Sequence, residues 1–210
     1  VLPVGYPGSP LRRAITKKRA DVLFPISRTS PFFDSALEGP YPHALVEAQI
    51  HILDFLNAHP ELRSIVKPSV GLDPEHGAFE HVLHRMPHLR TERYLTFSET
   101  LESSAPRAIV LDCPSTPLYE SLMTDSQIFC LRDPLAYLSP RAEKLLTQRV
   151  HLYEDPATLT RDLKRFLDGR LLEKGGTEFV DYYLRPNTSG LQLSGLFASL
   201  RPERHGFGLP

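Results

Sequence analysis

The sequence lacks the features that would place it in several large classes of protein. It contains no run of about 18 apolar residues that could cross a bilayer, and no signal-peptide pattern at its start. A glycine-rich dinucleotide fingerprint and a Walker loop are both absent, which argues against a nicotinamide dehydrogenase and a P-loop ATPase. No nucleophile-elbow sequence is present either, so the sequence nominates no Ser–His–Asp or Cys–His catalytic pair.

Net charge and cysteine are also scarce. The 24 basic residues nearly balance the 25 acidic ones, so no overall charge draws the chain to nucleic acid or to an acidic membrane. The two cysteines, Cys113 and Cys130, fall in stretches that we predict to be buried strands. We expect free thiols in a reducing compartment, and hence a cytoplasmic protein, either free or peripheral at the inner face of the membrane.

The rest of the composition is that of a folded domain. The chain has 210 residues, of which 41% are hydrophobic and 23% are charged, which is enough for one sizeable core. We expect four parts along the chain: a lead-in segment or linker at 1–20, an α/β domain at 21–175, a helical extension at 176–200 and a loose tail at 201–210.

Apolar runs and helix-like segments alternate along the α/β domain. The runs typical of buried strands are 21–27, 63–69, 109–111, 128–131 and 149–155, with a strand tip near Arg93. The helical segments are 43–58, 78–85, 139–149, 156–168 and two helices that begin at Thr96 and Thr116. This alternation, repeated five times, predicts a doubly wound, mostly parallel sheet with helices on both faces.

The segment from Ala108 to Leu131 carries the clearest functional signal. Thr116 followed by Pro117 is typical of a helix N-cap with proline at the first helical position. The free N–H groups of that helix would face the carboxyl edge of the sheet and could hold an anion. The same start recurs at Ser139-Pro140 and Asp155-Pro156, so by itself it needs no ligand. Glu120, however, comes four residues after the predicted cap, which does not fit a capping box and favours a ligand contact.

The order of these motifs resembles a known family. The stretches VLFPIS, IVKPS, LDCPSTPLYESL…IFCL and VHLYEDPATLTRDLKRFLDG are similar to the carboxyl-terminal, donor-binding half of GT-B-fold glycosyltransferases. The nearest group is that of the bacterial surface-polysaccharide and CDP-glycerol glycerophosphotransferase-like enzymes. The resemblance covers residues 20–200 and implies a Rossmann-like lobe that binds a nucleotide-sugar or CDP-alcohol donor.

The resemblance also implies roles for particular residues. Ser115 and Thr116 match the hydroxyl pair that holds the donor diphosphate, and Glu120 matches the acidic residue that binds the donor ribose or sugar. Lys67 matches the cation that offsets the charge developing on the leaving phosphate. Lys67 and Glu120 are therefore the expected catalytic residues. A lysine and helix amides can stabilise a leaving diphosphate without a metal ion.

The resemblance adds Ser27 and Arg28, at the end of the first strand, as further phosphate or nucleotide contacts. We expect no cofactor beyond the donor itself. Four histidines lie close together in the sequence, but none has a Cys or carboxylate partner at zinc-like spacing, so we predict no metal site. They are His76, His81, His84 and His88.

The sequence departs from the family at several points. Ser69 stands where the family often has histidine, and the turn at Cys113-Pro114 lacks glycine. The amino-terminal acceptor lobe of a GT-B enzyme is not in this sequence, so we expect it as a missing partner. Two alternatives stay open: a nonhydrolysing UDP-sugar 2-epimerase-like enzyme, and a noncatalytic binding module that keeps the fold.

Overall fold

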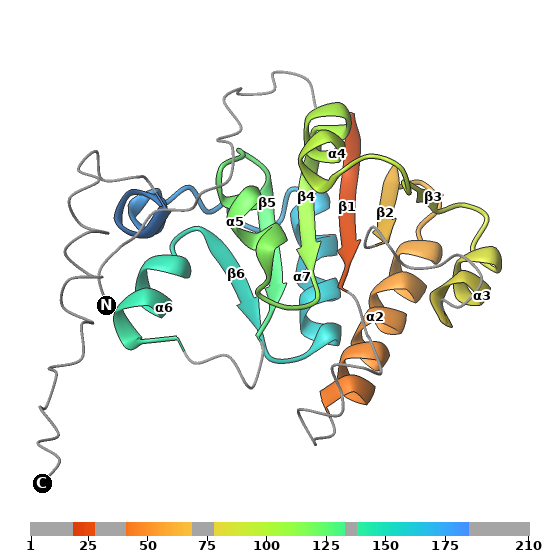
Figure 1. Ribbon diagram of the computed structural model, residues 1–210, viewed down its shortest axis with the longest axis horizontal. Coiled ribbons are helices and arrows are strands. Elements are labelled where there is room, and N and C mark those ends of the chain that lie inside the picture. Colours follow the sequence, from red (N-terminus) through yellow and green to blue (C-terminus); the bar gives the residue numbers. More distant parts are fainter. Residues whose placement is uncertain (1–18, 28–40, 69–77, 133–137, 185–210) are drawn as a thin grey trace, which may run out of the picture.

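The computed structural model describes residues 19–27, 41–68, 78–132 and 138–184. The strands of these residues form one sheet in which every neighbouring pair is parallel, in the order β3-β2-β1-β4-β5-β6 (Figure 1). The strands are β1 (Ala20–Ile26), β2 (Ser64–Pro68), β3 (Arg90–Thr91), β4 (Pro106–Leu111), β5 (Gln127–Leu131) and β6 (Val150–Tyr153). The order reverses between β1 and β4, which is where ligands bind in open α/β sheets.

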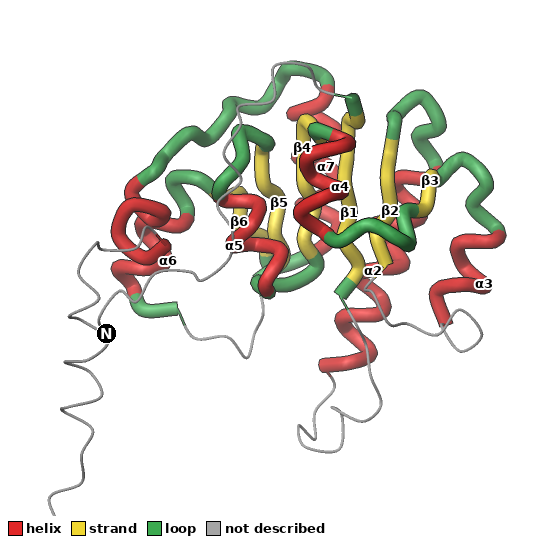
Figure 2. Tube along the Cα trace, turned by 45° about the horizontal axis from the view of Figure 1, so that its top comes forward, coloured by secondary structure: helices red, strands yellow, loops and turns green. Residues whose placement is uncertain are grey.

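Helices cover both faces of this sheet. Helices α2 (Tyr41–Asn57), α3 (Ala78–His84) and α7 (Pro156–Leu167) bury side chains on one face. Helices α4 (Phe97–Ser104), α5 (Thr116–Leu122) and α6 (Pro140–Leu146), with the π-helix η1 (Val180–Leu184), cover the other. Figure 2 shows the strands lying between α4 and α5 on one side and α7 on the other. The predicted doubly wound α/β fold is therefore confirmed.

The central strands are apolar on both faces because both faces are covered. Along β4, Ala108 and Val110 pack towards α2 and α7, whereas Ile109 and Leu111 pack towards α4 and α5. All four side chains are almost fully buried. This two-residue alternation decides which side chains at the strand ends face which group of helices.

Most helices begin and end where the sequence predicts. The capping box of α4 is formed, with Thr96 and Glu99 bonding each other's backbone N–H groups. Ser139 and Asp155 cap α6 and α7 through their side chains. Gly169 follows the C-cap of α7 with φ of 73°, a conformation that favours glycine. Among the described residues, no helix is both long and apolar enough to cross a membrane.

Three local details differ from the expectations. Strand β3 forms at Arg90–Thr91, before the predicted tip near Arg93, because only two residues pair with β2 and so short a strand has no apolar pattern. Cys113 lies in the half-buried turn after β4, not in a strand, whereas Cys130 is buried in β5. The helix expected after Gly176 is partly a π-helix. The remaining predictions for 1–18 and 185–210 lie outside the described residues.

His151 is a buried histidine at the edge of the sheet. It sits on β6, directly beside Phe129 of β5, and the two rings stack 4.8 Å apart at an interplanar angle of 12°. Its burial, together with the charge of Lys174, lowers the pKa of His151 to about 4. The native state therefore resists protonation of this ring, whereas the unfolded chain takes up the proton near the ordinary pKa of 6.5.

We therefore predict that stability falls as pH drops below about 6.5 towards 4, because only the unfolded chain binds the proton in this range. The contribution of His151 to the slope is at most about 1.4 kcal/mol per pH unit. His151→Phe, which keeps a ring against Phe129, should lose this contribution in urea titrations run at several pH values. His84→Phe, at an exposed position, is the matched control. An unchanged pH dependence in His151→Phe would contradict the prediction.

Candidate functional site

A pocket of about 550 Å³ opens at the carboxyl edge of the sheet, and we call it the Lys67 pocket. It is lined by Pro25, Ile26, Ser27, Lys67, Pro68, Phe97, Cys113, Ser115, Thr116, Pro117 and Glu120. Five of the six residues that the sequence nominated thus lie around one cavity. The sixth, Arg28, lies outside the described residues.

Strand register explains why these residues meet. Pro25 of β1 pairs with Lys67 of β2, so their side chains leave the sheet on the same face. Leu23 of β1 pairs with Ile109 of β4. Ser27 and Cys113 each come four residues after these paired positions, so the same register brings them side by side. Their side-chain atoms Oγ and Sγ lie 3.3 Å apart. This is the face that α4 and α5 cover, so the starts of both helices close the pocket.

Lys67 is a buried cation that has no counter-ion among the described residues. The residue is only 3% exposed, and its Nζ makes one long hydrogen bond of 3.4 Å to the carbonyl oxygen of Pro68. No carboxylate within the described ranges lies at salt-bridge distance from it. Burial lowers the pKa of Lys67, and the more distant charges of Glu92 and Glu99 oppose this effect. Burying a charge in this way costs free energy that a bound anion would offset.

The start of α5 differs by one residue from the prediction. Its N-cap is Ser115, with an extended backbone, and not Thr116. Pro117 consequently takes the second helical position, which suits proline as well because that N–H also has no partner within the helix. Ser115 makes no side-chain capping bond, and neither its hydroxyl nor that of Thr116 bonds to another described residue. Both hydroxyls line the pocket and can donate to a ligand.

Glu120 lies one turn into α5 and takes no part in capping. Its Oε2 accepts a hydrogen bond of 2.5 Å from the hydroxyl of Ser98, on the first turn of α4. This bond fixes the carboxylate in the wall of the pocket and leaves further acceptor positions open. Ser98 and its neighbour Phe97 were not predicted from the sequence to be part of the site. The capping box at Thr96 could have indicated them, because it marks the start of α4. A helix that follows a parallel strand begins at the carboxyl edge of the sheet, where the pocket lies.

Asp112 ties the pocket to the opposite face of the sheet. Its Oδ2 accepts from the backbone N–H of Ser27 at 2.8 Å and from Nε2 of Gln49 at 2.6 Å, and its Oδ1 accepts from the Ser27 hydroxyl at 2.6 Å. Gln49, on α2, also donates to the carbonyl oxygen of Ser27 at 3.1 Å. Burial raises the pKa of Asp112, and these hydrogen bonds oppose that rise. Asp112 therefore holds the end of β1 against β4.

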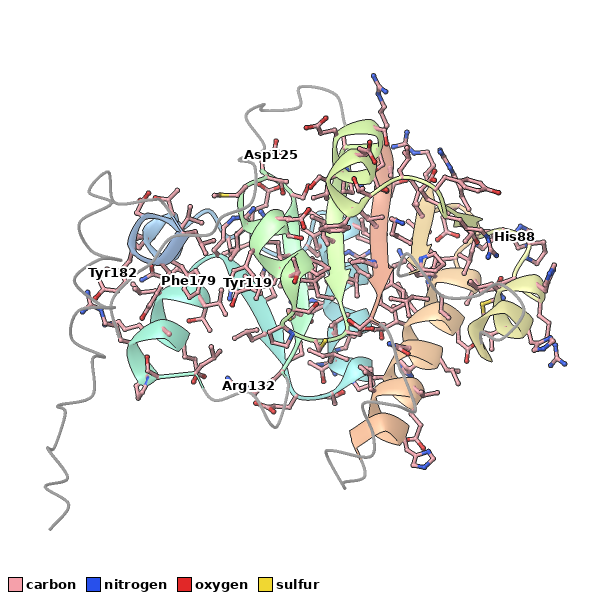
Figure 3. The ribbon with its side chains drawn as sticks, viewed as in Figure 1. His88, Tyr119, Asp125, Arg132, Phe179 and Tyr182 are labelled. Atoms are coloured by element: carbon pink, nitrogen blue, oxygen red, sulfur yellow. The ribbon has the colours of Figure 1, made fainter. Side chains whose placement is uncertain are left out.

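A second pocket of about 410 Å³ lies on the α2 side of the same edge and includes Asp112 and Arg132. Figure 3 shows Arg132 at this edge and Asp125 at the opposite one. The guanidinium of Arg132 is paired with Glu143 and, at 2.8 Å, with Glu154. Its charge is thus compensated, unlike that of Lys67.

Within the described part of the chain, no group of three His, Cys, Asp or Glu residues could hold a metal ion.

Comparison with known proteins supports the fold. No protein-family model matches the sequence, and no curated protein matches it at a significant level. Among solved structures, the chain is similar to that in the crystal structure of TarM, a glycosyltransferase, with a TM-score of 0.53 and 10% sequence identity. The match covers 89% of this chain and 36% of the TarM chain, so this chain spans little more than a third of that length. The likeness is one of fold: the chain has a GT-B glycosyltransferase-like fold, and at the level of the fold the resemblance in the sequence is confirmed.

The Asp112 bridge leads to a prediction about stability. Gln49→Leu introduces an apolar side chain of similar size and removes the donor to a buried carboxylate and to the Ser27 carbonyl. We expect the free energy of unfolding to fall by about 1–3 kcal/mol, measured by urea denaturation.

Glu47→Leu, on the same helix but exposed, is the matched control and should change stability by about 0.5 kcal/mol or less. A Gln49→Leu protein as stable as the wild type would show that Asp112 does not need this donor.

Proposed function

We propose that this chain is the nucleotide-donor-binding lobe of a glycosyltransferase, and that the Lys67 pocket holds a nucleotide-sugar or nucleotide-alcohol such as a CDP-alcohol. The observation that supports it best is a buried charge, that of Lys67, in a pocket with two hydroxyls, none of which is paired with another described side chain at salt-bridge or hydrogen-bond distance. A pocket of about 550 Å³ is also within the range usual for small-molecule sites.

Each residue that the sequence nominated has a role in this proposal. The diphosphate lies against Nζ of Lys67 and the hydroxyls of Ser115 and Thr116. The carboxylate of Glu120 accepts hydrogen bonds from the hydroxyls of the ribose or the sugar. Ser27 contacts the nucleotide from the end of β1, and Arg28, the next residue in the sequence, is a further phosphate or nucleotide contact in this proposal. No resident cofactor is part of the proposal, because the donor itself carries the group to be transferred.

For a nucleotide-sugar donor, the reaction is a displacement at the sugar carbon that carries the diphosphate. An acceptor hydroxyl attacks this carbon, the bond from the carbon to the diphosphate oxygen breaks, and the electron pair leaves with the diphosphate. The developing negative charge falls on oxygens beside Lys67, where a preorganised cation in a partly dry site lowers the barrier. The acceptor and the base that takes its proton belong to a separate acceptor lobe.

We propose a cytoplasmic transferase of surface polysaccharide synthesis, free or at the inner face of the membrane.

The proposal predicts selective nucleotide binding. In calorimetric titrations with UDP, CDP, GDP and ADP, we expect saturable binding with a clear preference for one of them. Lys67→Met keeps the length of the apolar stem but removes the charge, so affinity for that nucleotide should fall at least about 10-fold, as expected for a lost charge-assisted hydrogen bond. Lys144→Met, on the exposed side of α6, is the matched control and should bind as the wild type does. Equal binding by both variants would refute a role for Lys67.

The same variant separates a binding role from a structural one. Because Lys67 is buried and no carboxylate of the described residues pairs with it, Lys67→Met removes a desolvation cost and should melt at the same or a higher temperature than the wild type. Pyrophosphate should raise the melting temperature of the wild type but not that of the variant, since binding to the native state alone stabilises it. A strongly destabilised Lys67→Met would instead mark Lys67 as a structural residue.

A further inference from the structure

The hydroxyl of Ser27 has only one proton, and the structure shows where it goes. Ser27 Oγ lies 2.6 Å from Oδ1 of Asp112, whose other oxygen already accepts from two N–H groups, those of Ser27 and Gln49. A carboxylate with this set of donors acts as an acceptor at both oxygens, so the hydroxyl must donate to it. The proton of Ser27 is therefore committed to Asp112.

The neighbouring thiol strengthens this assignment. Cys113 Sγ lies 3.3 Å from Ser27 Oγ, close enough for a hydrogen bond in either direction. Since the hydroxyl proton points at Asp112, the thiol is the only donor left in this contact. Ser27 Oγ has two lone pairs, of which Cys113 takes one. The other is available on the side where Ser27 lines the Lys67 pocket, and it can only accept.

The pocket is thus divided by hydrogen-bond polarity. Lys67, Ser115 and Thr116 offer donors, which suit the oxygens of a phosphate. Ser27 and Glu120 offer acceptors, which suit the hydroxyl groups of a ligand. A phosphate oxygen placed against Ser27 would meet a lone pair and no proton, which is unfavourable for an anion.

We propose that Ser27 determines specificity by accepting a hydrogen bond from a ligand hydroxyl, so that the pocket selects phosphate esters of polyhydroxylated groups over bare phosphate or diphosphate. This inference rests on the proposed donor-binding function and refines it. It assigns Ser27 to the sugar or polyol part of the donor, whereas the sequence resemblance suggested a phosphate or nucleotide contact. Asp112 acts through Ser27, as a positioning residue that fixes the direction of the hydroxyl proton.

Asp112→Asn should reverse this polarity. The amide oxygen must face the two N–H donors at the Oδ2 position, so the new NH₂ group faces Ser27 and donates to its oxygen. The hydroxyl proton of Ser27 is then released towards the pocket. We expect this variant to bind pyrophosphate more tightly than the wild type and to lose part of its preference for hydroxylated ligands.

The test is a calorimetric comparison of inorganic pyrophosphate with UDP-glucose, CDP-glycerol, GDP-mannose, ADP-glucose and glucose 1-phosphate. For the wild type, at least one nucleotide conjugate should bind more tightly than pyrophosphate. Ser27→Ala should weaken that conjugate roughly 5-fold, the loss expected for one hydrogen bond, and leave pyrophosphate within about 2-fold. Ser103→Ala, an exposed serine on α4, is the matched control and should leave all affinities unchanged.

A second control separates polarity from charge. Glu99→Gln removes a negative charge felt by Lys67 but retains a side chain suited to the capping box, so it should strengthen pyrophosphate and conjugates equally. Asp112→Asn should strengthen pyrophosphate alone. If Asp112→Asn does not fold, Ser27→Ala decides the matter, because it leaves both N–H donors of Asp112 in place.

The outcomes distinguish this inference from the proposed function. If Ser27→Ala weakens pyrophosphate as much as the conjugates, Ser27 is a phosphate donor and the inference is overturned while the donor lobe stands. If glucose 1-phosphate binds as tightly as every nucleotide conjugate and shows the Ser27→Ala loss, the inference holds and the nucleotide-binding function fails. If no ligand binds, both are overturned.

Discussion

The site depends on one buried carboxylate at the point where the strand order reverses. Asp112 accepts hydrogen bonds from the backbone and hydroxyl of Ser27 and from Gln49, and so joins the end of β1 to the end of β4 and to helix α2. Strands β1 and β4 send their chains to helices on opposite faces, so their ends would otherwise diverge. The bridge holds the floor of the Lys67 pocket in place and orients the hydroxyl of Ser27.

The Lys67 pocket contains polar groups that have few hydrogen-bond partners among the described residues. Within the described part of the chain, Lys67 is buried without a counter-ion, and the hydroxyls of Ser115 and Thr116 at the start of α5 make no bond. By contrast, Arg132 at the same edge is paired with Glu143 and Glu154, and the buried Arg149 donates to the carbonyl oxygens of Thr124 and Ser126. Buried charged groups in proteins are normally paired or fully hydrogen-bonded. The contrast between Lys67 and these two arginines is therefore the physical basis for treating the Lys67 pocket as a binding site.

The sequence predicted the fold and the composition of the pocket because both depend on local patterns. Continuous apolar runs identified the buried strands, and the residues nominated at their carboxyl ends had to meet at one edge of a parallel sheet. The two-residue strand β3 escaped detection because it has no apolar period. Ser98 and Gln49 were missed because their partners, Glu120 and Asp112, lie 22 and 63 residues away in the chain, and no local pattern reports such pairs. The N-cap of α5 was misplaced by one residue because proline fits the first two helical positions equally well.

The claim that the Lys67 pocket holds the diphosphate of a nucleotide donor can be tested most directly by a crystal structure with the preferred nucleoside diphosphate. We predict phosphate oxygens about 2.8 Å from Nζ of Lys67, the distance of a charge-assisted hydrogen bond, with a ribose hydroxyl near Glu120 or Ser27. A nucleotide bound elsewhere, for example in the second pocket beside Arg132, with Lys67 still free of any anion, would contradict it.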